Sequence, residues 1–172
     1  MGELVADVRQ TIRDIPDFPK PGILFKDITP VLADPKLFSR VIDWMSLQFS
    51  DVDLVIGIES RGFIFGAALV EKLGKGLVLA RKAGKLPHTT ASKEYDLEYG
   101  TATIEMHTDS FKRGAKVLVV DDLLATGGTA HAAVSIAREL GAEVVGCVFL
   151  IELDFLKGRQ KLGCPSASLI HY

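Results

Sequence analysis

The stretch VLVVDDLLATGGTA, at positions 117–130, decides how the rest of the chain is interpreted. Its first four residues are apolar and mostly β-branched, which predicts a short strand buried on both faces. Two acids and a Thr-Gly-Gly-Thr turn follow, and the residues after the turn have helical spacing. A glycine turn before a helix brings backbone N–H groups and the positive end of the helix to one point. This order of elements therefore predicts a phosphate site.

The same stretch predicts what lies next to the phosphate. The two glycines let the backbone N–H groups converge, and the threonines on either side of them add hydroxyl donors. Asp121 and Asp122 precede the turn, where a dianionic phosphate would repel them, so we expect them to face neutral hydroxyl groups or a metal-bound group. A phosphate beside hydroxyl groups describes a ribose 5-phosphate. The alternative is a buried strand followed by a solvated acid pair and an ordinary turn.

Length and composition limit the classes of function. A chain of 172 residues fits one domain, so we expect a single domain over 1–172. The net charge of −2 argues against a general nucleic-acid or membrane-surface role. No segment has the apolar length of a membrane span, and the acidic N-terminal region does not resemble a signal peptide. Cys147 and Cys164 lack metal-site spacing, so we interpret both as structural and reduced, with the cytoplasm as the compartment.

Apolar periodicity predicts short strands alternating with amphipathic helices. We expect strands over 54–58, 76–80, 99–107, 117–120, 144–151 and 167–170. We expect helices over 3–14, 35–49 (with Asp34 as N-cap), from about 60 to 73, and over 130–140, and a short helix before the last strand. The proline-rich segment 17–30 is expected to be an ordered loop or flap. This alternation is typical of an α/β fold with a doubly wound, mostly parallel sheet.

Ligands of such sheets bind beyond the carboxyl ends of the strands, where three segments should converge. These segments are 59–62, 81–97 and 121–129. Ser60 and Arg61 open a helix and can hold a second anion, although a capping serine with a surface arginine is the alternative. The cations of 81–85 can bind the same anion as Ser60 and Arg61, and the alternative is that they are only solvated. Two anion sites beside one sugar site suggest a ribose that carries phosphate and pyrophosphate, and the long segment 81–97 is interpreted as a lid.

Two common nucleotide-binding motifs are not found. Residues 57–62 have the glycine spacing of a P-loop, but Phe63 stands where a lysine is required. No Gly-x-Gly-x-x-Gly fingerprint follows a strand, and the four histidines lack ligand spacing. ATP hydrolysis and NAD chemistry are therefore disfavoured.

The stretch 117–130 resembles the phosphoribosyl-pyrophosphate motif of the type I phosphoribosyltransferases, and the chain resembles those members that act on adenine. The resemblance covers nearly the full length, through segments 18–22, 25–30, 59–63, 81–87, 97–100, 151–153 and 156–159. It implies a twisted, mostly parallel sheet flanked by helices, with a flexible active-site loop. A small hood would come from the segments around 18–30 and 151–172.

The resemblance also implies a reaction. A 5-phosphoribosyl group would pass from phosphoribosyl pyrophosphate to N9 of adenine, giving AMP and pyrophosphate in purine salvage. Mg²⁺ would be carried by the substrate, without direct protein ligands. A homodimer is implied, because the position of Arg81 often reaches across a dimer interface in this family. No nucleic-acid or membrane partner is expected.

Site residues are carried over position by position. The 5-phosphate is assigned to Ala125, Thr126, Gly127, Gly128 and Thr129, and the ribose to Asp121 and Asp122. The pyrophosphate is assigned to Ser60, Arg61, Arg81, Lys82 and Lys85, with a cis peptide between Glu59 and Ser60. Adenine is assigned to Phe25, Lys26 and Leu153. Glu98 is the expected acid/base residue, with Tyr99 beside it, and Arg61 is expected to assist catalysis as a cation that stabilises the leaving group.

Ala125 bears on the choice of base. Family members that use hypoxanthine or guanine carry an acid at this position, and a methyl group cannot exchange a proton with the purine. A 6-oxopurine phosphoribosyltransferase is therefore the disfavoured enzymatic alternative. The alternative from another class is a regulator that senses phosphoribosyl pyrophosphate and binds nucleic acid, which should show a basic face or an added DNA-binding module.

Overall fold

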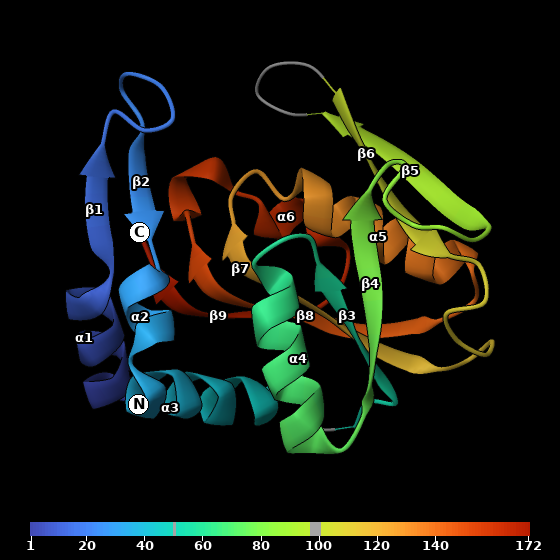
Figure 1. Ribbon diagram of the computed structural model, residues 1–172, viewed down its shortest axis with the longest axis horizontal. Helices are drawn as coiled ribbons and strands as arrows, with labels where there is room; N and C mark the ends of the chain where they lie inside the picture. Colours follow the sequence, from blue (N-terminus) through green and yellow to red (C-terminus); the bar gives the residue numbers. More distant parts are fainter. Residues whose placement is uncertain (50, 97–100) are drawn as a thin grey trace. The chain divides into compact units, whose positions relative to one another are not determined.

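The computed structural model describes residues 1–49, 51–96 and 101–172 (Figure 1). The chain forms two compact units, Met1–Trp44 and Met45–Tyr172. The expectations of one domain over 1–172, and of a hood built from both ends of the chain, stay predictions. No helix in the described ranges is long and apolar enough to cross a membrane.

The smaller unit begins with α1 (Gly2–Thr11), which buries Leu4 and Val8. The predicted helix over 3–14 is wrong at its end, because Ile12 is already extended, with φ −61° and ψ 131°. The following strand β1 (Arg13–Pro16) pairs with β2 (Leu24–Asp27) in an antiparallel ladder. The strand pairing therefore replaces the last turn of the predicted helix.

The prediction of a loop over 17–30 is wrong in its second half. β2 is a strand because β1 supplies its hydrogen-bonding partner, and Phe25 on β2 meets the Phe18 ring edge-to-face at 5.2 Å. The short helix α2 (Thr29–Ala33) contains Pro30 in its first turn, where a missing N–H breaks no helical bond.

The helix α3 (Pro35–Ser46) confirms the predicted cap. The Asp34 carboxylate accepts the N–H groups of Lys36 and Leu37, both at 3.0 Å. This side chain satisfies two of the N–H groups that a helix start leaves without an intrahelical partner. The helix ends three residues earlier than the predicted limit of 49.

The larger unit is built on a seven-stranded sheet with the order β5-β6-β4-β3-β7-β8-β9. Its strands are β3 (Leu54–Ile58), β4 (Gly76–Lys82), β5 (Thr90–Asp96), β6 (Thr101–His107), β7 (Lys116–Leu124), β8 (Glu143–Glu152) and β9 (Ser166–His171). Adjacent strands from β4 through β3, β7 and β8 to β9 are parallel, whereas β6 and β5 are antiparallel. The predicted mostly parallel α/β sheet is confirmed.

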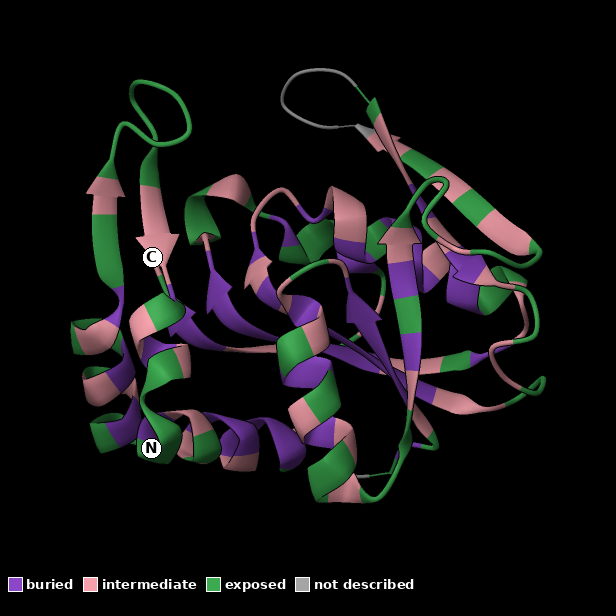
Figure 2. Cartoon of the chain, in the orientation of Figure 1, coloured by how far each residue is buried: buried purple, intermediate pink, exposed green. Residues whose placement is uncertain are grey.

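Helices cover both faces of this sheet. Figure 1 shows α4 (Gly62–Leu73) in front of the sheet and α5 (Gly128–Glu139) behind it. Alternate residues of β3 separate the two faces: Ile56 and Ile58 belong to the cluster packed on α5, while Gly57 approaches Phe63 of α4. The central strands are buried in Figure 2, as their continuous apolar runs predict. The 3-10 helix η1 (Asp154–Leu156) and the short helix α6 (Arg159–Leu162) lie between β8 and β9 in the chain.

The segment 81–97 is not the unpaired lid that its length suggested. β4 continues to Lys82, and β5 pairs with β6 over seven residues, from Thr90↔His107 to Asp96↔Thr101. The polar sequence of β5 gave no apolar alternation, so its strand depends on the partner that β6 provides. Residues 97–100, which lie between β5 and β6 in the sequence, are outside the described residues.

Candidate functional site at the carboxyl edge of the sheet

Four adjacent parallel strands, β4, β3, β7 and β8, end at one edge of the larger sheet. The segments that follow them are 83–85, 59–62, 125–129 and the turn that begins at Leu153. Sequence reasoning predicted that segments 59–62, 81–97 and 121–129 converge. The strand order confirms this for 59–62, for 121–129 and for the first residues of 81–97. The site divides into two parts, which we call the cradle (residues 125–129) and the charged side (residues 59–61 and 81–85).

The cradle is a turn between β7 and α5. Gly127 caps the helix with a φ of 79°, in the left-handed region that glycine adopts without strain. Its carbonyl oxygen accepts the N–H of His131 at 2.9 Å, so the helix begins directly behind the turn. A small pocket lies here, lined by Asp121, Leu123, Leu124, Ala125, Thr126, Gly127, Gly128, Thr129 and Ala130. The predicted 5-phosphate residues therefore line one pocket at a helix N-terminus.

Gly158 supports the cradle from outside, a role that sequence reasoning missed. A Cβ atom on Gly158 would lie 2.2 Å from the carbonyl oxygen of Ala125, and one on Gly127 would lie 2.4 Å from the carbonyl oxygen of Gly158. The two backbone segments are thus packed directly against each other. Gly158 lies 31 positions after Gly127 in the sequence, so no local pattern could reveal the contact.

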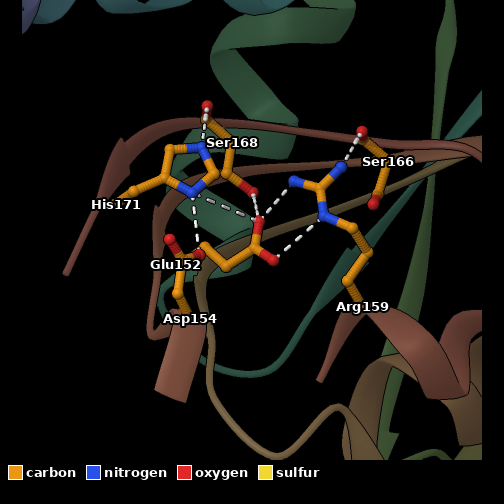
Figure 3. Close-up of polar contacts among 6 residues, drawn as sticks. All are labelled: Glu152, Asp154, Arg159, Ser166, Ser168 and His171. Atoms are coloured by element: carbon orange, nitrogen blue, oxygen red, sulfur yellow. Dashed lines mark hydrogen bonds and ion pairs between the residues drawn. The ribbon is translucent and has the colours of Figure 1, made fainter. Parts of the chain in front are cut away.

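The chain around Gly158 is held by a buried carboxylate (Figure 3). Glu152, which is 4% exposed, accepts two hydrogen bonds from the Arg159 guanidinium, one of them at 3.0 Å from Nε, and a third at 2.7 Å from the Ser168 hydroxyl. Burial alone would raise the pKa of Glu152, but the bonds from Arg159 and Ser168 outweigh it and hold the pKa below its usual value. This network fastens the start of α6 to the end of β8, where Leu153 follows.

The Glu152 network includes three side chains of metal-binding type. Carboxylate oxygens of Glu152 and Asp154 and a ring nitrogen of His171 lie within 4.8 Å of one another. The Glu152 carboxylate is already engaged by Arg159 and Ser168, and Nδ1 of His171 lies 2.9 Å from the Asp154 carboxylate. These contacts fit a structural network that fixes the chain after β8.

The acid pair lies where β7 meets the cradle. The Asp122 carboxylate is 8% exposed and contacts Nε of Arg61 at 2.9 Å. Burial, reinforced by the charge of Asp122, raises the pKa of Asp121 well above its usual value. Burial also raises the pKa of Asp122, while the Arg61 guanidinium opposes that rise. Arg61 thus connects the charged side to the acid pair. Of the two acids, Asp121 is the one that lines the pocket.

Glu59 organises the charged side, and sequence reasoning had not given it a binding role. Its carboxylate accepts Nε of Arg81 at 3.1 Å, Nη2 of Arg81 at 3.4 Å and the backbone N–H of Lys82 at 3.1 Å. Burial would raise the pKa of Glu59, but these bonds outweigh it and lower the pKa. The peptide between Glu59 and Ser60 is cis, as the resemblance implied. The signal for Glu59 was its position directly after β3, beside the cations Arg81 and Lys82 that end the neighbouring strand β4.

Arg81 is bound within its own chain. Besides Glu59, it donates from Nη1 to the carbonyl oxygen of Lys85 at 2.9 Å, and its guanidinium lies 5.9 Å from the centre of the Phe63 ring. Lys82 and Lys85 are exposed on the same turn. The structure therefore places the predicted cations at one edge, and the reach of Arg81 across a dimer interface stays a prediction.

Several predicted residues are not brought to this edge by the described geometry. Phe25 and Lys26 lie on β2 in the smaller unit, where Nζ of Lys26 contacts the Asp14 carboxylate at 2.7 Å. Leu153 lies in the larger unit and donates its N–H to the carbonyl oxygen of Leu124 at 2.9 Å. The adenine site of these three residues stays a prediction. Glu98 and Tyr99 lie outside the described residues.

Comparisons with known proteins agree with this geometry. Residues 28–163 match the model of the phosphoribosyl transferase domain family. The adenine phosphoribosyltransferase of Geobacter metallireducens is 58% identical over 158 residues, which cover 91% of this chain and 92% of that protein.

Solved structures show the same likeness. The adenine phosphoribosyltransferase of Thermoanaerobacter pseudethanolicus aligns with a TM-score of 0.94 and 50% identity, over 98% of this chain and 99% of that one. The Saccharomyces cerevisiae enzyme, in a complex with adenine and an imino-altritol bisphosphate, aligns with a TM-score of 0.93 and 39% identity, over 98% and 99% of the two chains.

Proposed function

This chain belongs to the adenine phosphoribosyltransferase family, and we propose that it joins adenine to ribose 5-phosphate at the carboxyl edge of its sheet. The reaction is a purine-salvage transfer: 5-phosphoribose passes from phosphoribosyl pyrophosphate to N9 of adenine, and AMP and pyrophosphate are formed. The observation that carries the proposal is the cradle. It is a pocket at the N-terminus of α5, lined by residues with N–H and hydroxyl donors and by Ala125.

The cradle holds the 5-phosphate. Its backbone N–H groups, the hydroxyl groups of Thr126 and Thr129 and the positive end of α5 all favour a dianion at this point. Asp121 and Asp122 then face the ribose hydroxyl groups, as hydrogen-bond acceptors.

The charged side binds the pyrophosphate. Arg61, Lys82 and Lys85, with the N–H groups around Ser60, offset the charge that develops on the leaving group as the glycosidic bond breaks. Such stabilisation of a developing charge is often the largest catalytic term, and one contact contributes about 10²-fold in rate. Glu59 keeps the Arg81–Lys85 turn next to Arg61.

Mg²⁺ is expected to bind through substrate oxygens and water molecules. The donor set fits this mode, because carboxylates at the edge already bind cations: Glu59 binds Arg81, and Asp122 binds Arg61. The Asp121 carboxylate, which lines the pocket, is a further oxygen group near the expected Mg²⁺ position. When bound, Mg²⁺ supplies charge neutralisation on the pyrophosphate.

We propose Phe25, Lys26 and Leu153 as adenine-binding residues, as the resemblance implies. Glu98 is the proposed acid/base group for the purine, as the resemblance implies. The Glu98→Gln variant should lower kcat while the Kd for phosphoribosyl pyrophosphate changes little. An unchanged kcat would remove Glu98 from the mechanism.

A panel of purines tests the proposal. The protein is mixed with Mg²⁺, phosphoribosyl pyrophosphate and, separately, adenine, hypoxanthine, guanine or xanthine, and nucleotide and pyrophosphate are measured together. We expect AMP and pyrophosphate in equal amounts from adenine, and much slower turnover of the 6-oxopurines because Ala125 has no carboxylate. Faster turnover of hypoxanthine than of adenine would contradict the assignment of the base.

We also infer a homodimer in the cytoplasm. Two large apolar side chains, Ile64 on α4 and Leu79 on β4, are 42% and 37% exposed, which suits an interface on this side of the sheet. The two free thiols suit a reducing compartment. Light scattering coupled to size-exclusion chromatography measures the mass directly, and a monomer at micromolar concentration would contradict the dimer.

A further inference from the structure

The chain's two cysteines meet on the opposite half of β8 from the candidate site. Cys147 lies in the strand and is fully buried, while Cys164 lies between α6 and β9 and is half-buried. Their sulfur atoms are 3.5 Å apart. β8 is tied to the residues that follow Cys164, because the N–H of Cys147 donates to the carbonyl oxygen of Pro165 at 2.9 Å and Cys147 is paired with Ser166 in the parallel ladder.

The two thiols differ in their surroundings. The hydrogen bond between them and burial both raise the pKa of Cys147, whereas the same bond lowers the pKa of Cys164. The Arg138 guanidinium, whose Nη2 donates to the carbonyl oxygen of Gly163 at 2.7 Å, favours the ionised form of both thiols and lowers the pKa of each. Cys164 is therefore the sulfur that ionises first and the one that solvent reaches, which are the properties of an attacking thiol.

We propose that Cys164 and Cys147 form a peroxide-reactive dithiol site, which closes to an intrachain disulfide. The sulfur atoms have to approach by about 1.5 Å, from 3.5 Å to a bond of about 2.05 Å. This distance is within the reach of small side-chain and loop adjustments, because Cys164 lies in the connection before β9 and not within a strand.

The reaction has two steps and consumes one hydroperoxide. The Cys164 thiolate attacks the terminal oxygen of the hydroperoxide, whose O–O bond breaks, and a sulfenic acid and an alcohol (or water, from hydrogen peroxide) are formed. The sulfur of Cys147 then attacks the sulfenic sulfur of Cys164, and the S–O bond breaks with release of water. The two thiols lose two electrons and two protons in total, and the hydroperoxide is reduced.

The disulfide should stabilise the fold without stopping the proposed reaction. It would join β8 to the segment that enters β9 and restrict the unfolded chain. Cys147 precedes Glu152 at the strand end by five residues, which corresponds to roughly 16 Å along a strand. The candidate site is therefore remote from the sulfur pair, and the inference does not depend on the proposed function.

Whole-protein mass spectrometry of the peroxide-treated full chain tests the site. We expect a loss of about 2 Da per chain, a cross-linked peptide containing Cys147 and Cys164, reversal by dithiothreitol, and a Tm increase of roughly 5 °C. Unreacted thiols, a disulfide between two chains, or oxygen added to Cys164 without a bridge would each overturn the proposal.

Two variants separate the roles of the sulfur atoms. In Cys164→Ser, at the half-buried position, the loss of mass and the Tm increase should both disappear. In Cys147→Ala, Cys164 should stop at the sulfenic acid and be trapped by dimedone. Labelling of Cys147 by dimedone in the Cys164→Ser variant, at the rate seen for Cys164, would contradict the assignment of the attacking thiol. If Cys147→Ala does not fold, the mass of the wild-type chain and of Cys164→Ser still decides whether the bridge forms.

Discussion

The cradle is fixed by backbone packed against backbone, whereas the charged side is fixed by hydrogen bonds between charged side chains. At the cradle, Gly158 leaves no room for a methyl group beside Ala125. On the charged side, the Glu59 carboxylate holds Arg81 and the N–H of Lys82. A close-packed backbone responds to added volume, and a charged contact responds to lost charge. The two halves should therefore fail under different substitutions.

The largest effect is expected from Gly158→Ala. The new methyl group would lie 2.2 Å from the carbonyl oxygen of Ala125 and 2.9 Å from the nitrogen of Gly127, so the cradle has to move. Because misplacement of about 1 Å can cost 10²-fold, we expect kcat/KM for phosphoribosyl pyrophosphate to fall by about that factor. Overpacking should also lower the free energy of unfolding by about 1–3 kcal/mol. Steady-state kinetics and thermal unfolding measure the two effects.

Gly2→Ala is the matched control, because a Cβ atom at Gly2 meets nothing within 4 Å. It should leave both kcat/KM and Tm nearly unchanged. Wild-type kinetics in a folded Gly158→Ala variant would show that the contact does not shape the cradle.

A smaller effect is expected from Glu59→Gln. The neutral amide keeps the size of the side chain but weakens its bonds to Arg81 and Lys82, so the turn of 81–85 is held less firmly. We expect KM for phosphoribosyl pyrophosphate to rise roughly 10-fold, which corresponds to about 1.4 kcal/mol. Glu139→Gln removes the same charge from an exposed pair with Lys93, at 2.8 Å, and should not change KM. Equal effects of the two substitutions would mean that net charge, and not the Glu59 contact, is responsible.

The smallest effect is expected from Asp121→Asn, which should raise the stability of the fold, whereas Gly158→Ala should lower it. The pKa of Asp121 is raised in the folded protein, so its contribution to stability is full below the unfolded value of about 3.9 and is lost as pH rises. Asp121→Asn should therefore raise Tm at pH 7, and the gain should shrink towards zero near pH 3. Activity should fall because a ribose contact is weakened.

Asp51→Asn provides the contrast for this prediction. Asp51 is exposed beside Lys116, whose hydrogen bond lowers the pKa of Asp51. Removal of this charge should give no gain in Tm at pH 7. Thermal unfolding of both variants from pH 3 to pH 8 checks the sign, and a loss of Tm in Asp121→Asn at pH 7 would contradict the burial argument.

The two halves also differ in how far the sequence predicted them. The cradle was predictable because strand, turn and helix follow one another within 14 positions, so local rules apply at every step. Arg61 and the cations of 81–85 were predictable as strand-end residues of a parallel sheet. Gly158 and the Glu59–Arg81 contact were not, because they join positions 31 and 22 residues apart, and only the assembled sheet brings them together.

The errors in the fold have a related cause. Pro30 was taken as a sign of a loop, but it occupies the first turn of α2, where proline is tolerated. The polar residues of β5 showed no strand pattern, and their ladder with β6 determines their conformation. In both segments the backbone conformation is determined by the neighbouring structure and not by the local amino-acid composition.

Binding of the two halves of the substrate tests the account most directly. Ribose 5-phosphate and magnesium pyrophosphate are titrated separately into the wild-type chain, Gly158→Ala and Glu59→Gln by calorimetry. We predict a crossed pattern: Gly158→Ala weakens ribose 5-phosphate about 10-fold or more and spares pyrophosphate, while Glu59→Gln does the reverse. Equal loss of both ligands in both variants would contradict two separately built halves of one site.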